Sequence, residues 1–347
     1  MSNKITTPVN KEEELSEWQA LLKKEDVLLR INDLHVEYRT ERAVVRALNG
    51  MNILIHKGES LGLVGETGAG KTTAALSILK LLPEEISSIT GGSIEFDGKG
   101  VHLMSQSELT DMRGGKVSMI FQNPLTALNP VFTVGEHIAM VLRVHQKLRN
   151  REAMERAAEL LEMVGIAGSR VKEYPFQFSG GMRQRVGIAA ALACNPMLLI
   201  ADEPTTALDV TIQAQILELM RKLQTQFDSS LLMITHNLGI IAQLCQQVAV
   251  MYAGRVIEYG AVKDVFSSPQ HPYTVGLLGA LPNLKGPRER LTAIPGIIAN
   301  PQNLPSGCAF HPRCADCGER CKTEQPLMKH VGNNHFVECF MREGGTD

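Results

Sequence analysis

The sequence predicts an α/β fold with a mainly parallel central sheet and a small cysteine-rich domain at its C-terminal end. Three observations support this prediction. Short β patterns alternate with longer helical patterns along most of the 347 residues, an order typical of sheets with parallel central strands. A glycine-rich loop stands between an apolar strand and a helix, and five of the seven cysteines lie between Cys308 and Cys339.

The elements can be assigned in chain order. Residues 1–26 are expected to form an N-terminal extension in which Leu15, Trp18, Leu21 and Leu22 share one helical face; that helix could pack on its own domain or dock to a partner. A large first domain is predicted at 27–280 and a Pro-rich linker with the cysteine-rich domain at 281–347. Within the former, β patterns fall at 27–31, 34–38, 51–55 and 60–64, and helical patterns at 151–164 and 211–227.

Composition excludes several classes of function. A net charge of -2 gives no reason to expect nucleic acid as a partner. The polar, acidic N-terminus does not resemble a secretory signal. The longest uncharged apolar stretch, 186–201, is broken by Asn195 and Pro196 and is shorter than the roughly 20 residues that a spanning helix needs. Any link to a membrane is therefore expected to run through a partner.

The glycine-rich loop at 65–72 predicts a phosphate-binding site. It reads G-x-x-x-x-G-K-T and precedes a helix that begins near Thr72. Glycines let backbone N–H groups turn toward phosphate oxygens, and a helix N-terminus favours negative charge. Lys71 is expected to reach the β- and γ-phosphates and the Thr72 hydroxyl to ligate Mg²⁺. The candidate nucleotide-binding residues are Gly65, Glu66, Thr67, Gly68, Ala69, Gly70, Lys71, Thr72 and Thr73.

A second apolar strand, 197–201, leads into Asp202 and Glu203. Ligands bind at the carboxyl ends of strands in open α/β sheets. Asp202 is therefore a candidate for holding Mg²⁺, and Glu203, on the opposite face, for polarising an attacking water. Taken alone, the pair could be two ordinary acids at the end of a strand; beside the glycine-rich loop it indicates a nucleotide-hydrolysing site.

Several further motifs resemble those of the ABC (ATP-binding cassette) ATPases, in order and over roughly residues 27–340. Ser179, Gly180 and Gly181 resemble the signature motif. The other resemblances are Gln122 to the Q-loop, Asp209 to the D-loop, His236 to the switch histidine and Tyr38 to the aromatic residue that stacks on adenine. The resemblance implies a P-loop NTPase core with an antiparallel β subdomain and a helical subdomain at about 123–185.

The resemblance also implies a mechanism. Two such domains would pair head to tail, each ATP lying between one phosphate loop and the signature motif of the other domain. Glu203 would act as general base, His236 would contact the γ-phosphate, and Gln122 would sense Mg²⁺ or the lytic water. Ser179, Gly180 and Gly181 would bind the γ-phosphate of the partner's nucleotide.

The cysteine-rich tail reads first as a metal site, because a disulfide framework is not expected in a chain without an export signal. Four thiolates suit either a [4Fe–4S] cluster or zinc, and their spacing leaves the choice open. The segments 268–274, 294–296 and 305–314 resemble the C-terminal region of the oligopeptide/dipeptide (and nickel) importer ATPases. That resemblance implies a [4Fe–4S] cluster on Cys308, Cys314, Cys321 and Cys339 rather than zinc, with no role assigned to Cys317.

The same resemblance implies a multi-subunit importer for short peptides, with nickel, glutathione or another solute as alternatives. Its expected partners are two membrane permeases, a second related ATPase and an extracytoplasmic binding protein. The chain would lie peripherally on the cytoplasmic face of the plasma (inner) membrane. A soluble ABC protein of translation or DNA repair is a weaker alternative, because such proteins usually carry two cassettes and this chain has one phosphate loop.

Overall fold

The computed structural model describes residues 26–41, 43–123, 128–206, 208–280 and 293–342. The helix expected around Leu15 to Leu22, the end of the Q-loop and the first part of the Pro-rich linker (281–292) lie outside these ranges. Because the structure tests no domain boundary, the division at residues 26 and 280 stays a prediction.

The main sheet has eight strands in the order β11-β12-β10-β9-β3-β8-β7-β6. Its centre is parallel, as predicted, because β9, β3, β8, β7 and β6 all pair in parallel. The remaining strands pair antiparallel at one edge. The strand bounds are β3 Ser60–Val64, β6 Val117–Ile120, β7 Leu198–Asp202, β8 Ser230–Ile234, β9 Gln247–Tyr252, β10 Arg255–Ala261, β11 Lys329–Gly332 and β12 His335–Val337.

A second, antiparallel sheet of four strands covers one face of the main sheet, in the order β2-β1-β4-β5. Its long strands are β1 Val27–Arg39 and β2 Val44–His56, followed by β4 Ser87–Phe96 and β5 Lys99–Gly100. The two β patterns expected at 27–31 and 34–38 are thus one strand, because register shifts near Leu34 carry β1 through the polar pair between them.

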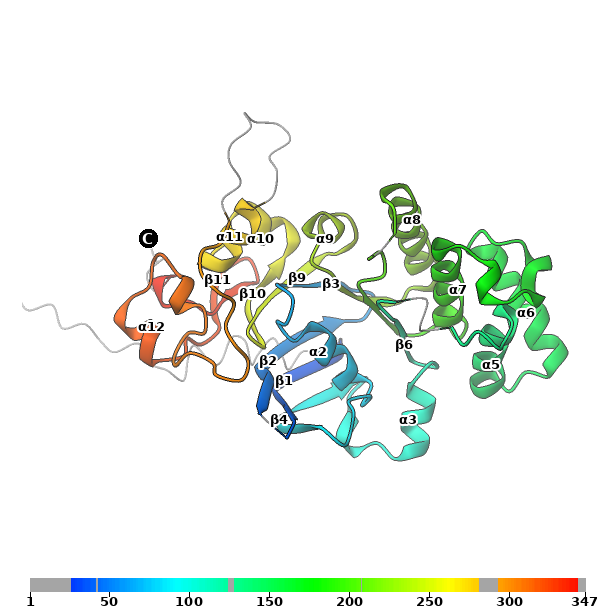
Figure 1. Ribbon diagram of the computed structural model, residues 1–347, viewed down its shortest axis with the longest axis horizontal. Coiled ribbons are helices and arrows are strands. Elements are labelled where there is room, and N and C mark those ends of the chain that lie inside the picture. Colours follow the sequence, from blue (N-terminus) through cyan, green and yellow to red (C-terminus); the bar gives the residue numbers. More distant parts are fainter. Residues whose placement is uncertain (1–25, 42, 124–127, 207, 281–292, 343–347) are drawn as a thin grey trace, which may run out of the picture.

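Helices form the other layers (Figure 1). A helical region, at the right of the view, contains α5, α6 and the start of α7, and α8 runs beside α7. Capping boxes begin α3 and α5, at Ser105 and Thr133. The helices are α2 Lys71–Ile78, α3 Gln106–Met112, α5 Val134–Gln146, α6 Asn150–Met163, α7 Gly180–Leu192, α8 Val210–Phe227, α9 Leu238–Leu244, α10 Val262–Ser267, α11 Pro272–Gly279 and α12 Glu319–Thr323.

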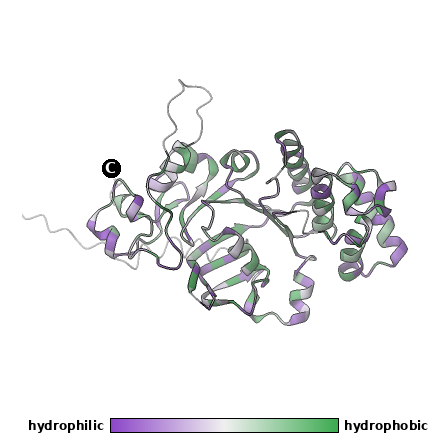
Figure 2. Cartoon of the chain, viewed as in Figure 1, coloured by the Kyte–Doolittle hydropathy of each residue, from purple (hydrophilic) through white to green (hydrophobic). Residues whose placement is uncertain are grey.

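Alternate residues of the central strands face two separate cores. In β7, Leu198 and Ile200 belong to the core shared with the antiparallel sheet and α2, whereas Leu199 and Ala201 belong to the core shared with the helical region. This is the period of two that a strand buried on both faces requires. Figure 2 shows the resulting hydrophobic colour along the central strands. The parallel strands are therefore fixed rigidly, and the loops at their carboxyl ends start from fixed positions.

The described part of the cysteine-rich tail is joined to the main sheet and forms no sheet of its own. Strand β12 pairs with β10, and β11 extends the same edge. An ion pair between the half-buried Arg255 and the buried Glu338, 2.9 Å apart, crosses the same junction. The expectation of a separate small C-terminal domain is not confirmed, because the tail shares its sheet and part of its core with the ATPase fold.

Candidate nucleotide-binding and hydrolysis site

The phosphate loop lies between β3 and α2, as the sequence predicts. Gly70, with φ of 102°, precedes the first turn of α2, and its conformation is one that glycine adopts without strain. The Lys71 ammonium donates to the carbonyl oxygens of Gly65, at 2.7 Å, and Glu66, at 3.1 Å. The loop thus folds around its own lysine, leaving the start of α2 available to an anion.

Burial lowers the pKa of the Lys71 ammonium, against the opposing charges of Glu203, Asp202 and Glu66. A phosphate group bound here would raise the pKa of Lys71 again, because an adjacent anion favours the protonated ammonium. The residues present therefore fit a nucleoside triphosphate.

Asp202 ends β7 and meets the start of α2. The Thr72 hydroxyl donates to its carboxylate at 2.8 Å. These are two oxygen ligands of the kind that Mg²⁺ prefers. Burial, and secondarily the charge of Glu203, raise the pKa of Asp202 despite the Thr72 hydrogen bond.

Glu203 is the centre of a hydrogen-bond network. The Gln122 amide donates to its Oε2 at 2.9 Å, and the Thr206 hydroxyl donates to the same oxygen at 2.9 Å. His236 Nδ1 lies 3.2 Å from Oε1. Glu203 also has a φ of 46°, an uncommon conformation for a non-glycine residue that clusters at functional sites. The structure therefore brings together the three side chains that the sequence assigned to hydrolysis.

The pKa of Glu203 is lowered, in contrast to that of Asp202. Burial acts to raise it, but the hydrogen bonds from His236 and Thr206, the charge of His236 and the hydrogen bond from Gln122 outweigh burial. Two neighbouring carboxylates with pKa values moved in opposite directions can take different roles. Thr206 is not among the residues predicted from the sequence, although its hydroxyl, three residues after Glu203, is the signal that could have indicated it.

The other predicted residues occupy separate parts of the fold. The Tyr38 hydroxyl lies 3.4 Å from that of Thr73, which places this ring beside the phosphate-binding helix. Ser179 caps α7 by accepting from the Met182 N–H, and Asp209 caps α8. In Figure 1, α7 and α2 stand apart, so the candidate signature motif is presented away from the phosphate loop of its own chain.

The five tail cysteines do not form a metal site in the described part of the chain, where no group of three or more His, Cys, Asp or Glu side chains is arranged to hold a metal ion. Cys321 and Cys339 are buried, and Cys308, Cys314 and Cys317 are half-buried and not disulfide-bonded. The structure does not support the expected [4Fe–4S] cluster, nor zinc.

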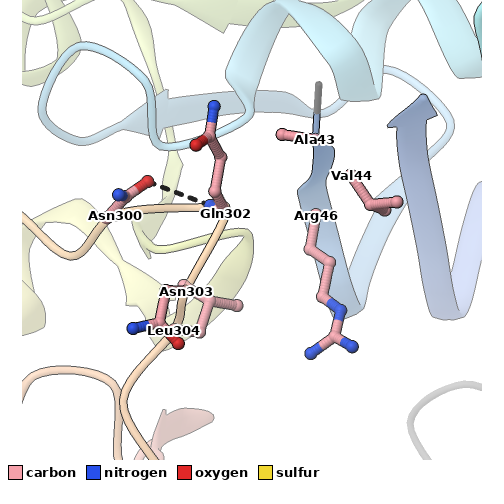
Figure 3. A pocket seen from close by; sticks show the side chains of 7 residues that line it. All are labelled: Ala43, Val44, Arg46, Asn300, Gln302, Asn303 and Leu304. Atoms are coloured by element: carbon pink, nitrogen blue, oxygen red, sulfur yellow. Dashed lines mark hydrogen bonds between the residues drawn. The ribbon is translucent and has the colours of Figure 1, made fainter. Parts of the chain in front are cut away.

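A separate polar pocket of about 480 Å³ opens between β2 and the segment 300–304 (Figure 3). None of the predicted site residues lines it. Its walls are Ala43, Val44, Arg46, Asn300, Gln302, Asn303 and Leu304.

Comparison with known proteins decides the family. The family model for the ABC transporter matches residues 48–206, and that for the oligopeptide/dipeptide transporter C-terminal region matches 257–321. The oligopeptide transport ATP-binding protein AppD of Bacillus subtilis is 47% identical over 318 residues, covering 91% of this chain and 97% of AppD. The chain belongs to the ABC transporter ATP-binding proteins. It is accordingly an ABC ATPase.

Two further comparisons agree with this family. The oligopeptide transport ATP-binding protein OppD of Salmonella typhimurium is 47% identical, covering 87% of this chain and 90% of OppD. Among solved structures, a dimeric ATP-binding cassette in a post-hydrolysis state, bound to ADP and Pi, superposes with a TM-score of 0.61 at 28% identity and covers 68% of this chain and 99% of its own. Within the described residues of this ABC ATPase, no helix is both long and apolar enough to cross a bilayer.

Proposed function

We propose that this ABC ATPase hydrolyses ATP to drive the import of short peptides. The carrying observation is the network on Glu203, in which Gln122, Thr206 and His236 hold an ionised carboxylate at the end of β7. The C-terminal region matching oligopeptide/dipeptide transporters and the relatives AppD and OppD support peptides as cargo.

The proposed chemistry assigns one task to each part of the site. ATP binds with its phosphates at the N–H groups of 65–73 and Lys71, and its adenine against Tyr38. Thr72 and Asp202, with Gln122, would hold Mg²⁺, which would offset the charge of the phosphates. Glu203 takes a proton from the attacking water, and its lowered pKa keeps it ionised at neutral pH. His236 stabilises charge at the γ-phosphate oxygens.

A second ATPase completes the site in this proposal. Ser179, Gly180 and Gly181, at the N-terminus of α7, bind the γ-phosphate of the partner's nucleotide, and Asp209 lies at the same interface. The exposure of Ser179 and Gly180 and the dimeric state of the solved cassette support this arrangement. We propose a related chain as the partner, with two permeases and an extracytoplasmic binding protein, at the cytoplasmic face of the plasma (inner) membrane.

Uptake into reconstituted vesicles tests the proposed cargo. Vesicles containing this chain, its permeases and the second ATPase are given a labelled tripeptide, Ni²⁺ or glutathione, with and without ATP on the side of the ATPases. ATP-dependent uptake of the tripeptide supports the proposal. Uptake of Ni²⁺ or glutathione alone would replace the peptide assignment and leave the ATPase assignment standing.

We propose separately that Cys308, Cys314, Cys321 and Cys339 close around a [4Fe–4S] cluster. The sequence resemblance supports this, as does proximity, because the Cys308 backbone N–H donates to the Cys321 carbonyl at 2.9 Å. The thiols do not have ligand geometry in the structure, so their closure is part of the proposal. Anaerobic purification with iron, sulfide and zinc analysis tests it; about four irons per chain supports a cluster, and an iron-free protein refutes it.

A further inference from the structure

Two side chains from outside the phosphate loop hold its second residue, Glu66. The Glu66 backbone N–H donates to the Tyr273 hydroxyl at 3.0 Å. Its carboxylate accepts from both terminal nitrogens of Arg313, at 2.7 and 3.1 Å. Tyr273 belongs to α11, and Arg313 to a short 3₁₀ helix, His311–Arg313, that directly precedes Cys314. Both belong to the C-terminal motifs at 268–274 and 305–314, to which the proposed hydrolytic mechanism gives no task.

The surroundings of Arg313 fix its guanidinium in one orientation. The residue is 7% exposed, and its Nε donates to the Pro295 carbonyl at 3.0 Å. The guanidinium carbon lies 5.7 Å from the ring centres of both Tyr252 and Phe310, which themselves pack edge to face. A planar guanidinium held along its stem and beside two rings presents its forked end to Glu66, a geometry that lysine does not reproduce.

The charge of Glu66 gives this contact a consequence for ATP binding. An unpaired carboxylate in the phosphate loop would repel a triphosphate. The carbonyl of the same residue also accepts from Lys71 at 3.1 Å, so displacement of Glu66 would disturb the lysine assigned to the phosphates. We propose that Arg313 is a positioning residue for ATP binding, which neutralises and orients Glu66 so that the loop accepts a nucleoside triphosphate. The inference rests on the proposed nucleotide site and adds the C-terminal segment to it.

A double-mutant cycle on the full-length chain tests the inference, with the Kd of a fluorescent ATP analogue as the readout. Arg313→Ala is expected to weaken binding about tenfold, because it leaves Glu66 charged and free to move. In a Glu66→Gln background the same replacement is expected to change the Kd by less than about twofold. An equal loss in both backgrounds, or no loss with Glu66 present, would overturn the inference.

Three further variants separate the explanations. Arg313→Lys keeps the charge without the fork and is expected to lose less affinity than Arg313→Ala; it also carries the cycle if thermal unfolding shows that the alanine variant does not fold. Arg151→Ala removes an exposed guanidinium paired with Glu155 on α6 and is expected to bind like the wild type. Lys71→Ala tests the nucleotide site itself, and a wild-type Kd in this variant would refute the proposed site. If Lys71→Ala weakens binding but Arg313→Ala does not, the nucleotide site stands and only the role of Arg313 is refuted.

Discussion

At the scale of single residues, the environments of Asp202 and Glu203 differ in a way that suits Glu203 to the role of base that we propose for it. Asp202 is more deeply buried, and its carboxylate accepts a hydrogen bond from the Thr72 hydroxyl. Glu203 accepts hydrogen bonds from Gln122 and Thr206. Hydrogen bonds to a carboxylate favour its ionised form, and burial opposes that form. One strand end thus supplies a carboxylate suited to Mg²⁺ and another suited to accepting a proton from water.

Thr206→Val tests how far this network supports hydrolysis. Valine removes the hydroxyl that donates to Glu203 Oε2, so we expect roughly a tenfold lower ATPase rate, with the acid limb of the pH–rate profile moved to higher pH. The direction follows from the loss of a hydrogen bond to the ionised form, which raises the pKa. Thr225→Val, on the exposed face of α8, is the matched control and should leave the profile unchanged. An unshifted acid limb in Thr206→Val would contradict this role.

At the scale of elements, the phosphate loop depends on a close approach between two backbones. A Cβ at Gly65 would lie 2.4 Å from the carbonyl oxygen of Met251 in β9, whereas a Cβ at Gly68 would meet no atom within 4 Å. The loop is therefore packed against β9 at its first glycine and open at its second.

Gly65→Ala and Gly68→Ala should consequently differ in stability. Gly68→Ala is strained only by its positive φ of 85° and should cost about 1 kcal/mol of unfolding free energy. Gly65→Ala must displace backbone and should cost about 3 kcal/mol. Chemical denaturation of both variants measures the difference, and equal losses would show that the contact with Met251 relaxes freely.

Helix α11 contains a pH-sensitive cap. Burial lowers the pKa of His271 to about 4, against the raising effect of Glu258, while its ring nitrogen accepts from the Tyr273 N–H. Because the pKa is depressed in the folded state, the stability contributed is complete above pH 6.5 and is lost as the pH falls toward 4. We expect the wild-type unfolding free energy to fall by about 2 kcal/mol more between pH 7 and 5 than that of His271→Asn, which keeps a capping acceptor. Identical pH slopes in denaturant unfolding would refute this.

At the scale of the whole molecule, the sequence was sufficient for the ATPase core but not for its junction with the tail. The glycine-rich loop, Asp202 and Glu203 were predictable because their spacing and strand context define the chemistry locally. The continuity of β1 across residues 32 and 33 was not predictable, because its register shifts near Leu34 depend on pairing with β2 and β4.

The other features that the sequence did not predict depend on contacts between residues far apart in the chain. The joining of β12 to β10 and the ion pair of Arg313 with Glu66 connect residues far apart in the chain, and no local pattern encodes such a pair. The motif containing Arg313 was recognised for its cysteines, and its arginine gained meaning only when the fold placed it at the phosphate loop.

We propose that this chain's own site hydrolyses ATP with Glu203 as the base. It is tested most directly by the ATPase rate of the purified full-length Glu203→Gln variant, measured beside its Kd for ATP. We expect a rate about 10² to 10⁴ times lower than the wild type, with the Kd unchanged because Glu203 acts on water and not on the bound phosphates. Hydrolysis at the wild-type rate by a variant that binds ATP normally would contradict it.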